Sequence, residues 1–460
     1  MYKIDFNKPL NVHFIGIGGI SMSGLAEILI NNHFTISGSD IAHSKMTEHL
    51  QSIGITVYIG HHAENLTNSL DLIVYTAAIS KDNPELLSAK ALSIPTMDRA
   101  ELLGQIMANY THSIGVAGTH GKTTTTSMMS QILLDANLDP TITVGGILDI
   151  LDGNIRVGSS NYFITEACEY ANSFLKFSPL IAIVLNVEED HLDFFKDIND
   201  IRSSFAGYLN NVPENGYIIM NSDIENYLGL LEGLNCNIIT YGTNEAISDW
   251  TCKNVSFNEK GCGNYDLYYK AKLVDHIQIN STGIHNVYNS IAAIAAAHTI
   301  GIDITSSKSS LENFSGPKRR FEYKGSLKGV TVIDDYAHHP TEIEATIKAA
   351  QKLEYNKLWI VFQPHTYSRT KAFLNNFAKA LSIADHVIIT DIYAAREKDP
   401  GDIHSTDLLV QMKDINENCH YFASFDDIEI FLLENLVPND VLITMGAGNI
   451  YIVGEDLLNG

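Results

Sequence analysis

The segment Val116-Ala-Gly-Thr-His-Gly-Lys-Thr-Thr-Thr-Thr126 is the most informative part of this chain for its architecture. An apolar run at 112–118 leads into the glycines, and a helical pattern begins at about Lys122. Such glycines let backbone N–H groups surround a triphosphate, while a lysine ammonium neutralises its β and γ oxygens. A hydroxyl of Thr123 or Thr124 can coordinate Mg²⁺ in such a loop. We therefore predict a phosphate-binding loop between a strand and a helix.

The spacing of this loop departs from the usual pattern, which places four residues between the first glycine and the Gly-Lys pair. Here only two residues separate Gly118 from Gly121. Because the strand, the glycines, the lysine and the threonine run coincide, we predict a shortened phosphate loop rather than an idle turn. The predicted nucleotide ligands in it are Gly118, Thr119, His120, Gly121, Lys122, Thr123 and Thr124.

A second glycine-rich turn lies near the N-terminus, in Phe14-Ile-Gly-Ile-Gly-Gly-Ile-Ser-Met-Ser-Gly24. The strand after it ends at Ser37-Gly-Ser-Asp40, so an acidic residue stands about 20 positions downstream, where a dinucleotide fold holds a ribose hydroxyl. Ser21 occupies the third glycine position of that fingerprint. The turn therefore fits a nicotinamide dinucleotide, a nucleotide sugar or a purely structural role. Its candidate binding residues are Gly16, Gly18, Gly19, Ser39 and Asp40.

Short apolar runs alternate with helical stretches along the whole chain, which is typical of parallel sheets covered by helices. The pattern restarts at residue 112 and again after the Gly-Pro-Lys-Arg-Arg cluster at 316–320. We predict an α/β protein of three domains: a Rossmann-like sheet at 1–107, a P-loop ATPase-type domain at 108–318, and a second Rossmann-like domain at 319–460. Predicted strands include 162–165, 181–186, 330–333, 358–362, 387–390 and 441–444, and predicted helices include 83–93, 122–136, 285–299, 341–353 and 370–382.

The composition excludes several classes of protein. A net charge of −24 over 460 residues would repel nucleic acid and anionic lipid. The five cysteines show no CxxC pairing, which favours free thiols in a reducing compartment. The N-terminus lacks a signal-peptide pattern, and no apolar run approaches about 18 residues. We expect a cytoplasmic protein, monomeric or homodimeric, with no nucleic-acid or membrane partner.

Two nucleotide-type loops in successive domains, the second reading Gly-Thr-His-Gly-Lys-Thr-Thr, resemble those of the Mur ligases of bacterial cell-wall synthesis. The opening residues 13–24 look most like the members that join L-alanine to UDP-N-acetylmuramate. Ser21 and Thr366 depart from the family pattern, since they stand where a glycine and, in some members, an arginine occur. Further motifs follow in the family's order over nearly the whole chain: Glu166-Ala-Cys-Glu-Tyr170, Asn186-Val-Glu-Glu-Asp-His191, Gly283-Ile-His-Asn-Val-Tyr-Asn289, Lys318-Arg-Arg-Phe321, Asp334-Asp-Tyr-Ala-His-His-Pro340, Phe362-Gln-Pro-His-Thr-Tyr-Ser-Arg369 and Gly446-Ala-Gly448.

The resemblance implies an ATP- and Mg²⁺-dependent ligase of cell-wall synthesis. The first domain would hold the UDP part of UDP-N-acetylmuramate, the middle domain MgATP, and the third the amino acid. The lactyl carboxylate would attack the γ-phosphoryl group, releasing ADP, and the amine of L-alanine would then displace phosphate from the acyl phosphate. Glycine, serine or a recycled peptide stay open as acceptors. A dinucleotide-dependent oxidoreductase and a nucleotide-gated binding module without catalysis are alternatives from other classes.

The resemblance also assigns roles in the middle domain. Glu166 and His191 each follow a predicted strand and, with Thr123, are the implied metal ligands. Glu166 is the better Mg²⁺ donor because that ion prefers oxygen, and His191 could instead orient a bound water or carboxylate. Arg319 and Arg320 follow Gly316-Pro317, which we call the Gly-Pro joint, at the predicted boundary to the third domain. Arg320 is the implied partner of the γ-phosphate. The implied adenine and ribose neighbours are His285, Asn286 and Asn289, although Asn286 also suits a helix N-cap.

In the third domain, the resemblance places the amino acid at the ends of two strands. Arg369 is the candidate for its carboxylate, because an arginine can donate two parallel hydrogen bonds. A histidine titrating near neutral pH could accept the ammonium proton: His338, or one of the other histidines after these strands, His339 and His365. Tyr336 and His365 are the further substrate neighbours. The expected catalytic set is Lys122, His191, Arg320, His338 and Arg369.

Overall fold

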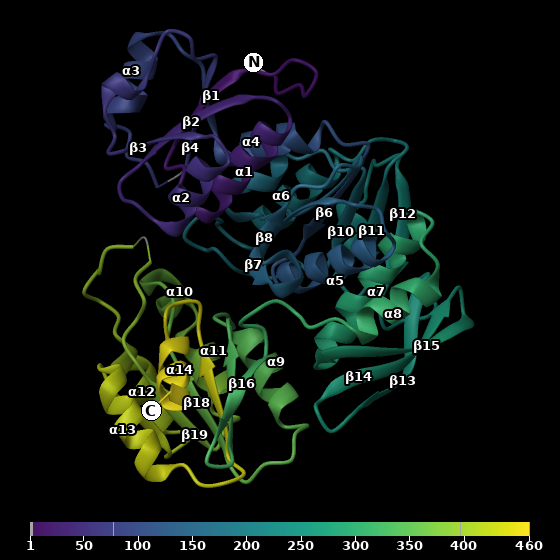
Figure 1. The fold of residues 1–460 in the computed structure, drawn as a ribbon. Helices are drawn as coiled ribbons and strands as arrows, with labels where there is room; N and C mark the ends of the chain where they lie inside the picture. The colour runs from purple at the N-terminus through teal and green to yellow at the C-terminus, as the bar shows by residue number, and fades with distance from the viewer. Residues whose placement is uncertain (1–2, 77, 396, 460) are drawn as a thin grey trace.

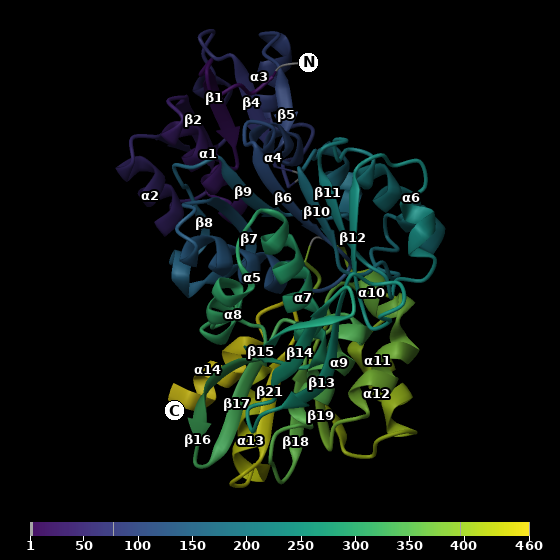
Figure 2. The same ribbon diagram turned by 90° about the vertical axis from the view of Figure 1, so that its right-hand side faces the viewer.

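The structure is a computed structural model that describes residues 3–76, 78–395 and 397–459. It contains three sheets, each flanked by helices, and so confirms the predicted three-domain α/β fold (Figure 1). The C-terminal domain lies beside the central domain, and the N-terminal domain lies at the far end of the molecule (Figure 2). No helix among the residues described is both long and apolar enough to cross a lipid bilayer.

The N-terminal sheet is parallel throughout, in the order β3-β2-β1-β4-β5. The chain reverses its direction of strand addition between β1 and β4, the point at which open α/β sheets bind ligands. The first glycine turn follows β1 at this point. The elements are β1 Asn11–Ile15, α1 Ile20–Asn31, β2 Thr35–Asp40, α2 Lys45–Ser52, β3 Thr56–Ile59, η1 Ala63–Asn65, β4 Leu72–Tyr75, α3 Pro84–Ala91, β5 Thr96–Asp98 and α4 Arg99–Met107.

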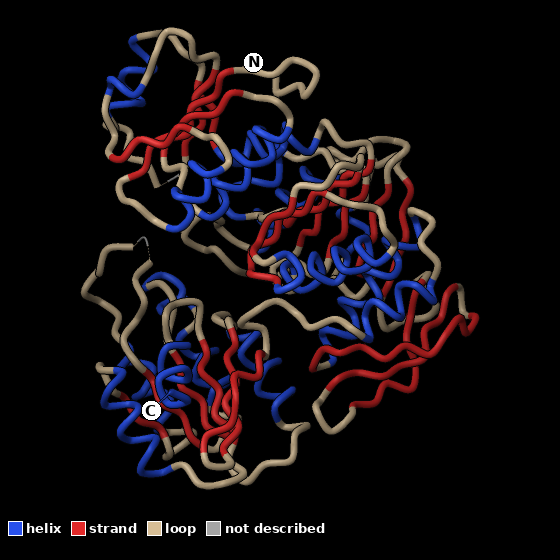
Figure 3. Tube along the Cα trace, in the orientation of Figure 1, coloured by secondary structure: helices blue, strands red, loops and turns tan. Residues whose placement is uncertain are grey.

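The central sheet has the order β15-β14-β13-β12-β11-β10-β6-β9-β7-β8. Its middle strands are parallel, and β13 to β15 form an antiparallel extension beside α7 and α8 (Figure 3). The elements are β6 His112–Ala117, α5 Lys122–Asp135, β7 Thr141–Leu148, η2 Asp149–Leu151, β8 Gly153–Arg156, β9 Tyr162–Glu166, η3 Tyr170–Lys176, β10 Ile181–Val184, α6 Ile198–Leu209, β11 Tyr217–Asn221, η4 Tyr227–Leu230, β12 Asn237–Tyr241, β13 Trp250–Phe257, β14 Cys262–Tyr269, β15 Lys272–Thr282, α7 Ile284–Thr299 and α8 Ile304–Glu312.

The C-terminal sheet has the order β16-β17-β21-β18-β19-β20, with only β16 antiparallel to its neighbour. The single helix predicted at 370–382 is wrong, because α10 ends at Ala372 and α11 begins at Leu374. The elements are β16 Glu322–Leu327, β17 Val330–Asp335, α9 Pro340–Ala350, β18 Leu358–Phe362, α10 Tyr367–Ala372, α11 Leu374–Leu381, β19 His386–Ile389, α12 Ser405–Lys413, β20 Cys419–Tyr421, α13 Phe425–Asn435, β21 Val441–Met445 and α14 Tyr451–Asn459.

The two domain interfaces differ in chemistry. Buried apolar side chains of the N-terminal domain, such as Met107, belong to the same core cluster as Phe174 and Phe177 of the central domain. The apolar clusters of the C-terminal domain are separate from it. The C-terminal domain instead meets the central domain through polar contacts, such as the ion pair of Arg369 with Asp190. The first interface therefore excludes water over a continuous apolar area, whereas ion pairs contribute to the second.

Gly24 of α1 provides a test of the first interface. A Cβ atom on Gly24 would lie 1.5 Å from Cδ1 of Ile155 in β8. We expect Gly24→Ala to lower the free energy of unfolding by about 1–3 kcal/mol, because overpacking forces neighbouring atoms to move. In an Ile155→Ala background the same change should cost much less, because only the Cβ of residue 155, 3.1 Å away, would still crowd the new atom. Denaturant titration of the four proteins measures both values, and equal effects in the two backgrounds would contradict the contact.

Candidate functional site

The phosphate-type loop joins β6 to α5, as the sequence predicts, and its glycines are conformationally required. Gly121 is the N-cap of α5 and has a φ of +83°. A Cβ on Gly121 would lie 2.9 Å from Oδ1 of Asn289, and one on Gly118 would lie 2.9 Å from Cβ of Leu185. Side chains at either position would therefore crowd the loop. The loop leaves the N-terminal N–H groups of α5 at its mouth, where they favour an anion.

Lys122 is held inside this loop by a carboxylate, Glu169, whose role is not evident from the sequence. Its ammonium donates to Oε2 of Glu169 at 2.9 Å and to the carbonyl oxygen of Thr119 at 3.1 Å. Burial alone would lower the pKa of Lys122, but the carboxylates of Glu169 and Glu166 outweigh it and hold this pKa above its ordinary value. Lys122 is therefore charged at neutral pH. In the sequence, Glu169 is marked only by its place in the motif at 166–170.

A pocket between the central and C-terminal domains brings together three groups of predicted residues; we call it the interdomain pocket. The loop, the start of α7 and the Gly-Pro joint lie far apart in the sequence, and only the fold makes them neighbours. Because the pocket is bordered by loop N–H groups, amides and a guanidinium, it suits a polyanion. Its lining includes His120, Gly121, Thr124, Asn186, Glu188, His285, Asn286, Asn289, Arg320, Asp335 and Glu342.

The two arginines of the joint have different environments. Arg319 donates to Asp334 at 2.8 Å and to the carbonyl oxygens of Gly446 at 2.7 Å and Gly448 at 2.9 Å, so it braces the C-terminal domain. Arg320 lines the interdomain pocket, with Nη1 3.8 Å from Oε1 of Glu342. Arg320 is therefore the arginine that can face a bound anion.

The start of α7 corrects the alternative role of Asn286. The helix begins at Ile284, and its N-cap is Gly283, with a φ of +94°. Asn286 thus lies inside the first turn, where its Nδ2 donates back to the carbonyl oxygen of Thr282 at 2.8 Å. Its Oδ1 accepts from Nδ2 of Asn289 at 3.0 Å. A side chain in this position orients its neighbour instead of capping the helix.

The predicted metal ligands come from three different elements. Glu166 ends β9 and accepts from the backbone N–H of Gly145 at 2.5 Å through Oε1. Thr123 lies in the first turn of α5, and His191 follows β10 with a φ of +53°. Within the described residues, no group of three or more His, Cys, Asp or Glu is arranged to hold a metal ion. A threonine hydroxyl and one carboxylate nevertheless fit Mg²⁺, which usually completes its shell with water and substrate phosphates.

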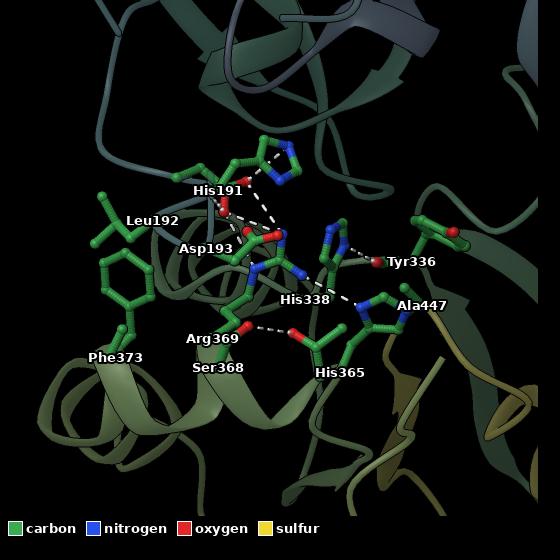
Figure 4. A pocket seen from close by; sticks show the side chains of 13 residues that line it. His191, Leu192, Asp193, Tyr336, His338, His365, Ser368, Arg369, Phe373 and Ala447 are labelled. Atoms are coloured by element: carbon green, nitrogen blue, oxygen red, sulfur yellow. Dashed lines mark hydrogen bonds and ion pairs between the residues drawn. The ribbon is translucent and has the colours of Figure 1, made fainter. Parts of the chain in front are cut away.

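A second pocket, which we call the acceptor pocket, lies beside His191 (Figure 4). It collects the four side chains predicted for the third domain, which come from the ends of β17 and β18 and from α10. Figure 4 shows Arg369 reaching toward the loop at 190–193 of the central domain, with His338 and His365 beside it. The lining includes Asp190, His191, Leu192, Asp193, Tyr336, His338, His365, Thr366, Ser368, Arg369, Phe373 and Ala447.

Arg369 forms an ion pair with Asp190, a residue whose role is not evident from the sequence. Its Nη2 and Nε donate to Oδ1 of Asp190 at 3.0 Å and 3.2 Å, and its Nη1 lies 3.2 Å from Nδ1 of His365. Both charged side chains are buried. Burial alone would raise the pKa of Asp190, but the Arg369 guanidinium holds it well below its ordinary value. In the sequence Asp190 ends an acidic run that is typical of a solvated loop.

The histidines of this region differ from the expectation of a group that titrates near neutral pH. His338 is held through Nδ1, 2.9 Å from the carbonyl oxygen of Tyr336, and burial lowers its pKa to about 3. Burial also lowers the pKa of His339 to about 4. Since a desolvated imidazolium is costly, both rings are neutral. Burial of this kind depends on tertiary packing and leaves no mark in the sequence.

The N-terminal turn uses two of its predicted ligands to hold itself. The N–H of Gly18 donates to Oδ2 of Asp40 at 2.8 Å, and the N–H of Gly16 donates to the carbonyl oxygen of Ser39 at 2.8 Å. The Ser39 hydroxyl is fully buried and donates to Oε2 of Glu85 at 2.6 Å. Ser39 is one of the candidate binding residues, and its hydroxyl is thus turned into the domain. Gly19 is the N-cap of α1.

Comparisons with known proteins agree with this geometry. Three family models match the chain: "Mur ligase family, catalytic domain" at 11–111, "Mur ligase middle domain" at 116–297, and "Mur ligase, glutamate ligase domain" at 319–448. The UDP-N-acetylmuramate–L-alanine ligases of Agathobacter rectalis and Lachnospira eligens are 56% and 54% identical to this chain, each over 100% of both chains. The solved UDP-N-acetylmuramate-alanine ligase of Thermotoga maritima is 28% identical, with a TM-score of 0.80 over 98% of both chains.

A murein peptide ligase of Psychrobacter arcticus is also similar in structure, with 26% identity and a TM-score of 0.69 over 98% of both chains. The matched ranges cover most of the three sheets and both glycine-rich loops. The resemblance noted in the sequence is thereby confirmed, and the chain belongs to the Mur ligase family.

Proposed function

We propose that this protein joins L-alanine to the lactyl carboxylate of UDP-N-acetylmuramate at the expense of ATP, an early step of peptidoglycan synthesis. The observation that carries the proposal is the pair of pockets at the interface between the central and C-terminal domains. The interdomain pocket suits a nucleoside triphosphate, and the acceptor pocket holds Arg369 and His338 beside the same central-domain loops. The proposed domains are 1–107 for the UDP-sugar, 108–318 for ATP and 319–460 for the amino acid.

Activation of the carboxylate is the first chemical problem, since a carboxylate repels an amine. In the proposed reaction, Lys122 and the N–H groups of α5 hold the β- and γ-phosphates, and Arg320 faces the γ-phosphate from the C-terminal domain. Mg²⁺, held by Thr123 and Glu166 with His191 nearby, would supply further neutralisation of the transferring group. Attack by the lactyl oxygen then expels ADP and leaves an acyl phosphate.

Amide formation is the second step. Arg369 orients the acceptor by its carboxylate, and a histidine of the acceptor pocket receives the proton lost by its ammonium group. Burial makes His338 a weak base, which favours His365, 3.2 Å from Arg369, within the predicted group. Enclosure between the two domains excludes water, which would otherwise hydrolyse the acyl phosphate. Leu192 and Phe373 border the acceptor pocket and favour a small side chain on the amino acid.

The test of this function is ADP release by the purified protein with ATP, Mg²⁺ and UDP-N-acetylmuramate. We expect release to depend on L-alanine, and to be much slower with glycine, L-serine or the peptide expected of a murein peptide ligase. Faster release with the peptide would assign the second candidate function, which the similarity to the Psychrobacter arcticus enzyme favours. Fluorescence titration with NAD and NADP should show no binding, which separates the ligase from an oxidoreductase.

Glu166 provides a separate test of the metal site. We expect Glu166→Gln to raise the Mg²⁺ concentration for half-maximal activity by about 10–100-fold, since an amide oxygen is a weaker ligand than a carboxylate. Glu214→Gln, on an exposed loop of the same domain, is the control and should leave this concentration unchanged. An unaltered Mg²⁺ titration of Glu166→Gln would show that its carboxylate does not hold the metal.

A further inference from the structure

One carboxylate, that of Glu342, contacts polar groups from three segments that meet at the interdomain pocket. Glu342 lies in the first turn of α9, in the C-terminal domain. Its Oε1 lies 3.3 Å from Nδ1 of His120 in the phosphate loop and 3.8 Å from Nη1 of Arg320 at the joint. Its Oε2 accepts from the backbone N–H of His338 at 3.1 Å. The Glu342 side chain is 13% exposed, so these contacts are made largely away from water.

The two oxygens of Glu342 have separable roles. The contact of Oε2 with the His338 N–H closes the start of α9, a role that any acceptor side chain at this helix position can fill. The contacts of Oε1 serve no local structure, because His120 belongs to another domain and Arg320 to the joint. Since this second oxygen faces two cationic groups in the pocket lining, its negative charge matters there more than its shape.

His120 is held by neighbours from both domains, and its side chain is 12% exposed. Its backbone is held by Asn186, whose side chain accepts from the His120 N–H at 2.7 Å and donates to its carbonyl oxygen at 3.1 Å. Its ring lies between two carboxylates, Glu188 at 3.6 Å and Glu342 at 3.3 Å, and against the ring of His339 at a centroid distance of 4.6 Å.

Burial alone would lower the pKa of His120, but Glu188 and Glu342 raise it to about 9. The ring is therefore an imidazolium at neutral pH. Glu188 belongs to the domain of His120, whereas Glu342 comes from the C-terminal domain. One of the two carboxylates beside this ring is therefore present only when the C-terminal domain lies against the phosphate loop.

We propose that Glu342 is a positioning residue of the ligase reaction: from the C-terminal domain it holds the cationic ring of His120 and the guanidinium of Arg320 against the triphosphate. The inference rests on the proposed use of ATP and adds a residue to it. Glu342 acts through two cations and touches no reacting atom. Its charge reaches the phosphate loop only when the two domains lie together.

The test compares the Glu342→Gln variant with the wild-type protein. Glutamine keeps an oxygen that can accept from the His338 N–H, but it removes the charge that faces His120 and Arg320. We expect kcat/KM for ATP to fall by about 10–100-fold, the usual loss for partners that orient binding groups. The melting temperature and the KM for L-alanine should be unchanged. Glu344→Gln is the matched control, because Glu344 lies on the same helix and pairs with Lys348 near its surface.

A pH series separates positioning from a structural role. Without Glu342 the pKa of His120 should fall toward the ordinary histidine value of about 6.5. The ratio of kcat/KM for ATP, variant over unchanged protein, should therefore decrease as the pH rises from about 6.5 to 8.5. Titration of the amino-acid amine affects both proteins equally and cancels in this ratio. In a His120→Asn background the added Glu342→Gln change should cost much less, because the two residues act together.

The outcomes are distinguishable from those of the proposed function. If the wild-type protein releases no ADP, the ligase proposal is wrong, whatever the effect of Glu342. If the unchanged protein is active, a ratio near one at every pH overturns the inference. A pH-independent loss accompanied by a lower melting temperature also overturns it, because Glu342 would then only cap α9.

Discussion

Replacement of Lys122 by alanine is expected to lower ATP-dependent ADP release by at least about 10³-fold, while binding of the UDP-sugar is retained. The ammonium is the compact positive charge of the phosphate loop, and loss of one such stabilising donor costs about 10²–10³-fold by itself. Lys122 also neutralises Glu169, at 2.9 Å. Removing the cation leaves a buried carboxylate that repels the γ-phosphate, so the two losses act in the same direction.

The retained function is the informative part of this experiment. The N-terminal turn belongs to a different sheet from the phosphate loop, so calorimetric titration with UDP-N-acetylmuramate should give the affinity of the unchanged protein. Breaking a buried ion pair costs about 3–5 kcal/mol, and thermal melting will show whether Lys122→Ala stays folded. Lys122→Met, which fills the same space without charge, is the second variant.

The control for Lys122 is Lys253→Ala, which removes a half-exposed lysine that pairs with Glu245 in the same domain. ADP release by this control should equal that of the unchanged protein. If both Lys122 variants stay folded and still lose UDP-sugar affinity, the assignment of the two ligands to separate domains is wrong.

Arg369→Lys is expected to raise the KM for L-alanine by about 10–100-fold with little change in the KM for ATP. Lysine keeps the charge but loses the planar fork that can donate two parallel bonds to a carboxylate. A hydrogen bond to a charged group contributes about 1.5–3 kcal/mol, and about 1.4 kcal/mol corresponds to a tenfold change in affinity. In this structure the guanidinium of Arg369 donates to Asp190. The carboxylate of the amino acid must therefore share Arg369 with this carboxylate of the central domain.

The control for this prediction is Lys371→Arg, the reverse exchange on the same helix, at an exposed lysine that pairs with Asp402. Initial rates over a grid of ATP and L-alanine concentrations give both KM values. If the KM for ATP rises as much as that for L-alanine, the main role of Arg369 is to join the two domains through Asp190.

Much of the fold is predictable because its signals are local. The strand at 358–362 has the predicted bounds, and the helix after the phosphate loop begins at Lys122 as predicted. Apolar periodicity and glycines at strand ends report directly on backbone geometry. The predicted helix at 370–382 fails for the complementary reason. The break at Phe373, where φ is −111°, has neither glycine nor proline to announce it.

Many residues of the candidate site are predictable from the sequence, but the ion pairs that they form are not. Lys122, Asn289 and Arg320 were named from motifs, and the structure places all three around the phosphate loop or the interdomain pocket. Glu169, Asp190 and Glu342 were not assigned roles, although each forms an ion pair with a predicted site residue. Acidic residues are common in this chain, so a single one carries little information until its partner is known.

The amino-acid sequence by itself determined the alternation of strands and helices, the two glycine turns and the family, because these depend on residues close together in the chain. Only the tertiary structure decided which charges are paired across the domains and which histidines are too buried to be charged. Desolvation and Coulomb interaction depend on distance in space, and residues such as Asp190 and Arg369 become neighbours only where the central and C-terminal domains lie against each other.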